Sequence, residues 1–132
     1  MIRQKFNVEH YWSVVIYYDV DYNLFSSIIK DFVYIGASYY TIEECYYMLK
    51  YGHAKAATLS NLYKHRSIVL FNVHNSKEDY LNSIVHEAEH IKQAMLDAYD
   101  VEDVGEPPAY TIGYIISRMY PIIKDIICYK CY

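Results

Sequence analysis

Ser83-Ile84-Val85-His86-Glu87-Ala88-Glu89-His90-Ile91 is the stretch around which this chain is organised. Its apolar residues recur every three or four positions, which predicts an amphipathic helix over about residues 77–99. At about 100° per residue, one stripe of that helix is apolar and forms the expected core face: Leu81, Ile84, Val85, Ala88, Ile91 and Met95. His86 and His90 lie almost opposite this stripe, and Glu87 lies to one side.

Two histidines separated by one helical turn can bind one metal ion. At positions i and i+4, both imidazoles reach a tetrahedral zinc ion at about 2.0–2.1 Å, and the acid between them can accept a proton. The pattern His86-Glu87-x-x-His90 fixes only three positions. A solvent-facing helix surface that carries two histidines by chance is therefore the competing interpretation.

The segments around this helix predict an α+β domain. An apolar strand over 67–73 precedes it, and Pro107-Pro108 suits the first turn of a further helix over 109–120. Pro121 is expected to kink or end that helix. The two helices are expected to pack on each other beside a short sheet.

The first sixty residues predict one strand and two helices, and residues 53–60 have no clear period beyond a short extended piece. The expected elements are a long strand over 6–20, a helix over 22–35 ended by Gly36, and a helix over 42–51 opened by the capping box Thr41-x-x-Glu44. No repeat or linker divides the chain. Residues 1–132 are therefore expected to form one domain, with its motif-bearing part at 67–120.

The composition excludes several function classes. Apolar residues make up 54% of the chain and charged residues 21%, as in globular proteins. The net charge of −4 is dispersed, which argues against binding to nucleic acid or anionic lipid, and the 18 tyrosines are expected to pack in and around the core. No signal peptide or membrane span is expected, so the predicted location is cytoplasmic. Three cysteines indicate reduced thiols, and Cys128-x-x-Cys131 lacks the context of a redox or zinc motif.

A third metal ligand is expected after the motif helix. Glu106 follows His90 by sixteen residues, beyond a turn marked by Gly105. Two helices joined there can fold back on each other and bring this carboxylate towards the histidines. A His₂Glu set leaves a fourth position open for water, as a catalytic zinc site requires. Glu102, Asp97 and Asp103 are the alternative third ligands.

The motif helix followed by a glutamate on the next helix resembles the gluzincin branch of the zincin-like metallopeptidases. More narrowly, SIVHEAEH with GEPPAYTIGYI resembles small zinc-peptidase-like proteins of phages and prophages. The resemblance covers residues 67–120. It implies a zincin-like fold with strand 67–73 bordering the cleft, zinc ligands His86, His90 and Glu106, and Glu87 as the general base.

This resemblance implies hydrolysis of a peptide bond by zinc-activated water. Glu87 would take the proton of the water and pass it to the leaving amine. Tyr110 lies one turn beyond Glu106 and could donate a hydrogen bond to the developing oxyanion, and an ordinary packed tyrosine is the alternative for this residue. A peptide or protein substrate would lie extended beside strand 67–73. The alternative is a zincin-like protein that binds metal or a protein partner without catalysis, in the manner of a phage accessory or regulatory protein.

Overall fold

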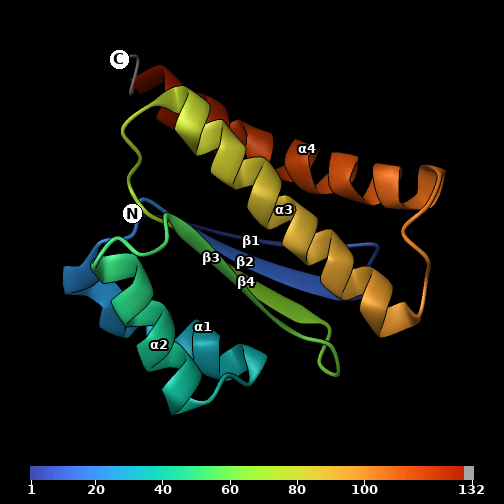
Figure 1. The fold of residues 1–132 in the computed structure, drawn as a ribbon, viewed down its shortest axis with the longest axis horizontal. Helices are drawn as coiled ribbons and strands as arrows, with labels where there is room; N and C mark the ends of the chain where they lie inside the picture. The colour runs from blue at the N-terminus through green and yellow to red at the C-terminus, as the bar shows by residue number, and fades with distance from the viewer. Residues whose placement is uncertain (130–132) are drawn as a thin grey trace.

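The computed structural model describes residues 1–129 and shows an α+β fold with a mixed four-stranded sheet (Figure 1). Its elements are β1 (Ile2–Val8), β2 (Trp12–Tyr18), a 3₁₀ turn (Tyr22–Leu24), α1 (Phe25–Ile35), α2 (Tyr39–Lys50), β3 (Ala56–Asn61), β4 (Arg66–Phe71), α3 (Lys77–Tyr99) and α4 (Glu106–Tyr129). The sheet order is β1-β2-β4-β3, in which only β2 and β4 run parallel. The expected α+β class is confirmed at this level.

The helices cover both faces of the sheet, which therefore has two hydrophobic cores. Helices α1 and α2 pack on one face, where the core includes Ile28, Phe32 and Leu70. Helices α3 and α4 pack on the other, where it includes Trp12, Ile91 and Ile115. Figure 1 shows the two helix pairs on opposite sides of the strands. Alternate residues of the central strands point into different cores, which explains why these strands are apolar throughout.

The predicted long strand over 6–20 is wrong, because the chain turns back in the middle of it. Residues 2–8 and 12–18 form an antiparallel hairpin, closed by a hydrogen bond from the Tyr11 N–H to the Val8 carbonyl at 3.2 Å. Glu9 and His10 form the turn with positive φ angles of 53° and 65°. Such turns usually carry Asn or Gly, and neither residue is present there. The sequence therefore shows no signal that would divide residues 6–20 into two strands.

Helix α1 ends as expected, with Gly36 in the left-handed conformation at a φ of 87°. The expected start of α2 at Thr41 is wrong. The hydroxyl of Ser38 caps the helix by accepting a hydrogen bond from the Thr41 N–H, and the first turn already contains Tyr39. Because Ser38 supplies the capping oxygen, Thr41 lies inside the helix.

Helix α3 has the predicted bounds, and Ser76 caps it by accepting from the Asp79 N–H at 3.1 Å. Four residues of the predicted core stripe are buried, but Leu81 and Val85 are exposed. Ser83 and Glu87 are buried in their place. The buried arc is therefore rotated, because α3 lies across β3 and also packs against α4.

Helix α4 contains the two prolines of its first turn, as predicted, whereas the expected end of the helix at Pro121 is wrong. The helix continues from Glu106 to Tyr129 through that proline. Cys131 of the Cys-x-x-Cys pattern lies outside the described residues. Within residues 1–129, no helix has the length and apolar character needed to cross a membrane.

Candidate metal and catalytic site

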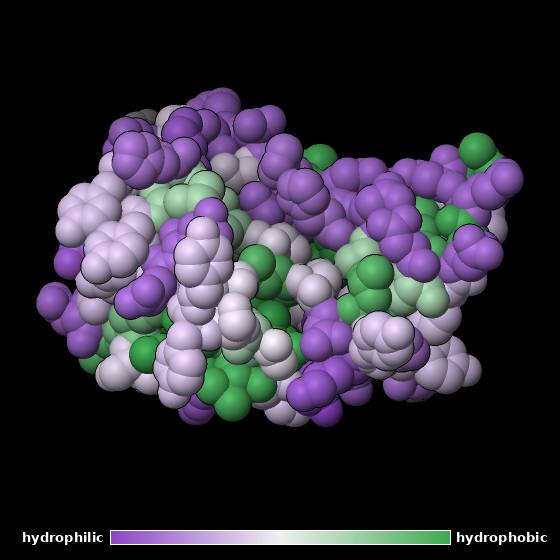
Figure 2. Space-filling view, turned by 60° about the horizontal axis from the view of Figure 1, so that its bottom comes forward, coloured by the Kyte–Doolittle hydropathy of each residue, from purple (hydrophilic) through white to green (hydrophobic). Residues whose placement is uncertain are grey.

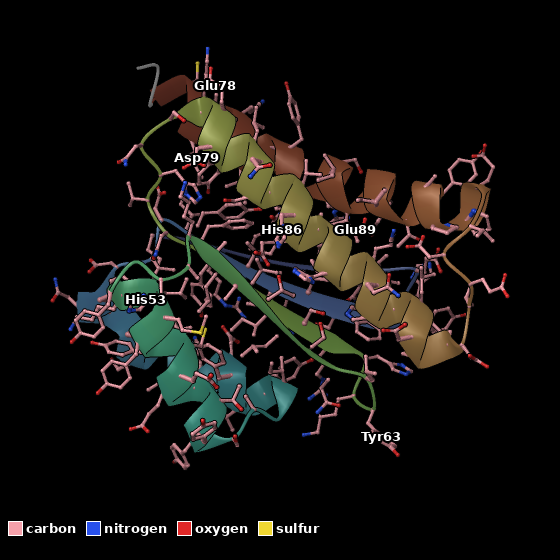
Figure 3. All side chains as sticks on the ribbon, in the orientation of Figure 1. His53, Tyr63, Glu78, Asp79, His86 and Glu89 are labelled. Carbon is pink, nitrogen blue, oxygen red and sulfur yellow. The ribbon has the colours of Figure 1, made fainter. Side chains whose placement is uncertain are left out.

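The motif of α3 lines a hollow at the open edge of the sheet, here called the motif hollow. Its volume is about 390 Å³. One wall is formed by His86, Glu87 and His90 of α3, the opposite wall by residues of α2 that include Glu44 and Cys45, and the floor by β3. Figure 3 shows His86 on the side of α3 that is turned towards β3. The hollow exists because α2 and α3, from opposite faces of the sheet, both extend past the same edge strand.

The two motif histidines lie against each other at the surface. The Nε2 atoms of His86 and His90 are 3.1 Å apart, and the two rings are inclined by 78°. Two nitrogens on one tetrahedral zinc ion are separated by about 3.3 Å, given ligand distances of about 2.0–2.1 Å. The pair is therefore spaced as two ligands of one ion. Both side chains are exposed, so that a metal can reach them from solvent.

Glu87 is buried beside this pair, with only 5% of its surface exposed. Its Oε2 atom accepts a hydrogen bond of 2.5 Å from the hydroxyl of Thr58 on β3. The side chain still lines the motif hollow. Thr58 therefore holds the carboxylate in one orientation at the edge of the space next to the histidines, where a proton acceptor would have to lie.

Strand β4, expected to border the cleft and pair with a peptide, is an internal strand, so that expectation is wrong. It is paired with β2 on one side and β3 on the other, and β3 is the edge strand. The backbone carbonyl of Lys55 accepts a hydrogen bond from the Asn72 N–H at 3.0 Å, which fixes the alternation of paired and free backbone groups along β3. The N–H and C=O groups of Ala56, Thr58 and Ser60 consequently face the open edge.

The other two predicted site residues lie apart from the motif hollow. Glu106 is exposed at the first position of α4. Tyr110 is 72% exposed and lines a different hollow, together with Glu9 and His10 of the first hairpin. The structure thus brings together His86, Glu87 and His90 but not Glu106 or Tyr110.

The alternative third ligands are also separate or already bonded. Asp103 accepts hydrogen bonds from Lys92 at 2.9 and 3.0 Å, and Asp97 accepts one from Gln93 at 3.0 Å. Glu102 is exposed in the loop before α4. In the described part of the chain, no three His, Cys, Asp or Glu side chains are gathered as a metal site. The two motif histidines are thus spaced to share one metal ion, but within the described residues no third possible ligand is gathered beside them.

Sequence reasoning missed the residues that α2 and β3 contribute. Thr58 lies in a segment without a clear period, and Cys45 and Glu44 lie thirty or more residues before the motif. Cys45 is buried, and this burial raises the pKa of its thiol to about 12. No local pattern marks these residues, because only the packing of α2 and α3 around one strand brings them to the motif.

His74, in the segment that leads from β4 into α3, contacts the motif helix at Ser83. This buried side chain places Nδ1 2.7 Å from the Asn72 carbonyl and Nε2 2.8 Å from the hydroxyl of Ser83. The carbonyl accepts the Nδ1 proton, so in a neutral ring Nε2 accepts the proton of Ser83. The contact fixes the end of β4 against α3, one turn before His86.

Comparisons of this chain with protein-family models, with curated proteins and with solved structures each give no match. The functional argument therefore depends on the side chains of the motif hollow and on their geometry.

Proposed function

We propose that this protein is a zinc-dependent hydrolase that cleaves a peptide bond in the motif hollow. The observation that carries the proposal is the close pair of His86 and His90 beside the buried carboxylate of Glu87. Exposed metal-binding nitrogens next to a proton acceptor held by Thr58 are the minimum that such a hydrolase needs.

Each residue has a distinct role in this proposal. His86 and His90 hold the zinc ion, and Glu87 accepts the proton of the attacking water and returns it to the leaving amine. When bound, zinc supplies the Lewis acidity that makes water nucleophilic near neutral pH and polarises the scissile carbonyl. Thr58 orients Glu87 through its hydrogen bond.

The open edge of β3 is the place for the substrate. A peptide in extended conformation can pair with the outward N–H and C=O groups of Ala56, Thr58 and Ser60. Thr58 also contacts Glu87, so a chain bound at that edge would pass beside the motif. The resemblance to gluzincins assigns the third ligand to Glu106, whereas Glu44 is the glutamate that faces the histidines across the hollow.

Zinc binding and hydrolysis are tested with the full chain and six single variants. We expect one zinc ion per wild-type chain, a rise in melting temperature with zinc, and loss of both in His86→Ala but not in His53→Ala. Glu87→Gln should keep the zinc and lose at least about 100-fold in hydrolysis of a peptide library, the range expected for a lost general base. Glu89→Gln is the matched control, since Glu89 pairs with Lys92 at 2.6 Å and does not line the hollow.

The results of these experiments distinguish a catalytic zinc site from a non-catalytic one and from the absence of a metal site. A wild-type chain that binds no zinc contradicts the metal site. Stoichiometric zinc without any cleavage of the library supports the non-catalytic metal-binding alternative. A comparison of zinc affinity in Glu106→Gln and Glu44→Gln identifies the third ligand, because only the true ligand weakens binding when it becomes an amide.

A further inference from the structure

A second hollow lies on the outer face of α2, here called the tyrosine hollow. It has a volume of about 350 Å³ and is lined by the rings of Tyr40, Tyr47 and Tyr51, with Glu43 and Glu44 between them. The three rings are 74%, 52% and 63% exposed, and those of Tyr47 and Tyr51 stack at a centroid distance of 5.8 Å. Figure 2 shows ring-bearing side chains at the surface on the side of the molecule that carries α1 and α2.

The tyrosine hollow adjoins the motif hollow. Glu44 and Met48 line both of them, and they lie one helical turn apart on α2. A peptide bound at the edge of β3 would therefore have the tyrosine hollow within reach of a side chain that points towards α2. Large exposed aromatic groups beside a proposed substrate edge mark a contact surface rather than part of the core.

The tyrosine hollow carries negative charge, which favours a positively charged ligand. Within the described residues, the carboxylates of Glu43 and Glu44 make no hydrogen bond or ion pair. Aromatic faces attract cations, and carboxylates strengthen that attraction. One ring of the hollow and one ring beside it already contact a cation of the chain, because the Nζ atom of Lys50 lies 5.9 Å from the ring centre of Tyr51 and 5.1 Å from that of Tyr46.

We propose that the tyrosine hollow is a specificity subsite for a lysine or arginine side chain of the peptide substrate. This inference rests on the proposed function, since it assigns the substrate of the same site. The cation lies against Tyr40, Tyr47 and Tyr51. It is neutralised by Glu43, and also by Glu44 if Glu106 rather than Glu44 is the third zinc ligand. Substrates with basic residues near the scissile bond are therefore favoured over neutral and acidic ones.

The test measures binding without turnover, in zinc-free wild-type protein. Three fluorescent decapeptides differ only in carrying Lys, Gln or Glu at two alternate positions, and anisotropy gives their dissociation constants at low salt. We expect the Lys peptide to bind at least about tenfold more tightly than the Glu peptide. The preference should fall several-fold in Glu43→Gln/Glu44→Gln and in Tyr47→Leu, which keeps apolar bulk but removes the ring.

Glu78→Gln/Glu89→Gln is the matched control, because it removes two negative charges from α3, on which Figure 3 labels both residues. It should keep the preference. Equal binding of the three peptides, or an equal loss in the control pair, overturns the inference. Self-association of the wild type that Tyr47→Arg abolishes also overturns it, by showing that a second copy of the chain covers this face.

The two proposals fail in different ways. Zinc-dependent hydrolysis without any charge preference overturns the subsite alone. A charge preference that depends on Glu43 and Glu44 in a protein that hydrolyses nothing overturns the proposed function, and with it the role of the hollow as a substrate subsite, while its binding of cations stands.

Discussion

Adjacent residues of the motif have opposite environments. His86 is exposed and touches His90, whereas Glu87, the next residue, is buried and bonded to Thr58. Successive helical positions are about 100° apart, so one residue can face solvent while its neighbour faces the sheet. In the proposed site, this burial pattern would separate the exposed metal-binding histidines from the buried carboxylate beside them.

Asp31 of α1 shows how a single buried carboxylate supports the fold. It accepts hydrogen bonds from Arg3 at 2.9 and 3.1 Å and a further one from the hydroxyl of Tyr17. Burial acts to raise the pKa of Asp31, but the hydrogen bonds from Arg3 and Tyr17 outweigh it and hold this pKa below its ordinary value. Burial, and then the contact with Asp31, raises the pKa of Tyr17 to about 12.

Asp31→Asn is expected to lower the free energy of unfolding at pH 7 by about 2 kcal/mol, the range for hydrogen bonds to a charged group. This expected loss is smaller than for a fully buried ion pair, because the side chain of Arg3 is 39% exposed and solvent screens the interaction. A depressed folded-state pKa stabilises the protein above the unfolded value of about 3.9, and the effect is lost as the pH falls through the folded value. Urea unfolding at pH 7 and at pH 3 measures how much of this stabilisation is lost as the unfolded state becomes protonated.

The difference between wild type and Asp31→Asn should therefore shrink at pH 3. Asp125→Asn is the control, since Asp125 is exposed on α4 and should have little effect at either pH. An Asp31→Asn penalty that is as large at pH 3 as at pH 7 would contradict the assignment of the stability to the ionised carboxylate.

At the scale of elements, the structure follows the sequence signal that starts α3 but not the signal that should end α4. Ser76 and the acidic residues after it define the start of α3, and the structure follows that signal. Pro121 gives an equally clear signal to stop, yet α4 continues beyond it. The apolar residues Met119, Ile123 and Ile126 are all buried against the sheet and α3. The free energy of this burial offsets the backbone hydrogen bond that proline cannot donate.

Pro121→Ala is accordingly expected to stabilise the protein by about 1–3 kcal/mol, because alanine restores the N–H and removes the ring that disfavours helix. The Pro121 side chain is exposed, so little packing is lost. Urea unfolding or the melting temperature measures the gain.

Pro108→Ala provides the contrast. Pro108 is buried in the first turn of α4, where an N–H has no helical partner, so its replacement should give no such gain. Equal effects of the two substitutions would show that the stability change does not come from the interior hydrogen bond.

At the scale of the whole molecule, the candidate site belongs to no single element. Helices α2 and α3 pack on opposite faces of the sheet, in two separate cores, and meet only across the open edge of β3. Both proposed functions of this edge, zinc-dependent hydrolysis and recognition of a basic side chain, depend on that arrangement.

Cys45 is a reporter for this arrangement, because it lies in the motif hollow and yet is buried. Burial raises the pKa of its thiol to about 12, so little thiolate forms at pH 8. In Cys128→Ser/Cys131→Ser, iodoacetamide should label Cys45 only at the rate of global unfolding, which denaturant accelerates.

The control is Cys45→Ser/Cys131→Ser, in which the exposed Cys128 should be labelled at once in the native protein. Rapid labelling of Cys45 without denaturant would show that α2 separates from β3 while the rest of the protein remains folded. Mass spectrometry of the alkylated chains distinguishes the two cases.

The sequence by itself determined the helix of the motif, its start at Ser76, the end of α1 at Gly36 and the spacing of His86 and His90. It also predicted most of β4, although the strand ends at Phe71 and not at Val73. These features depend on contacts between residues that are close in the chain, so that local patterns report them. Two features were not predicted from local patterns. The hairpin at Glu9 lacks the residues usual in such a turn, and the edge strand β3 has no clear hydrophobic period.

Only the tertiary structure decided which side chains meet across the motif hollow. It brought Thr58 to Glu87, set Glu44 and Cys45 opposite the histidines, and separated Glu106 and Tyr110 from them. These relations follow from the packing of two helices on opposite faces of one sheet. Such packing depends on the summed burial of many apolar residues that are distant in sequence, and no short stretch of the chain records it.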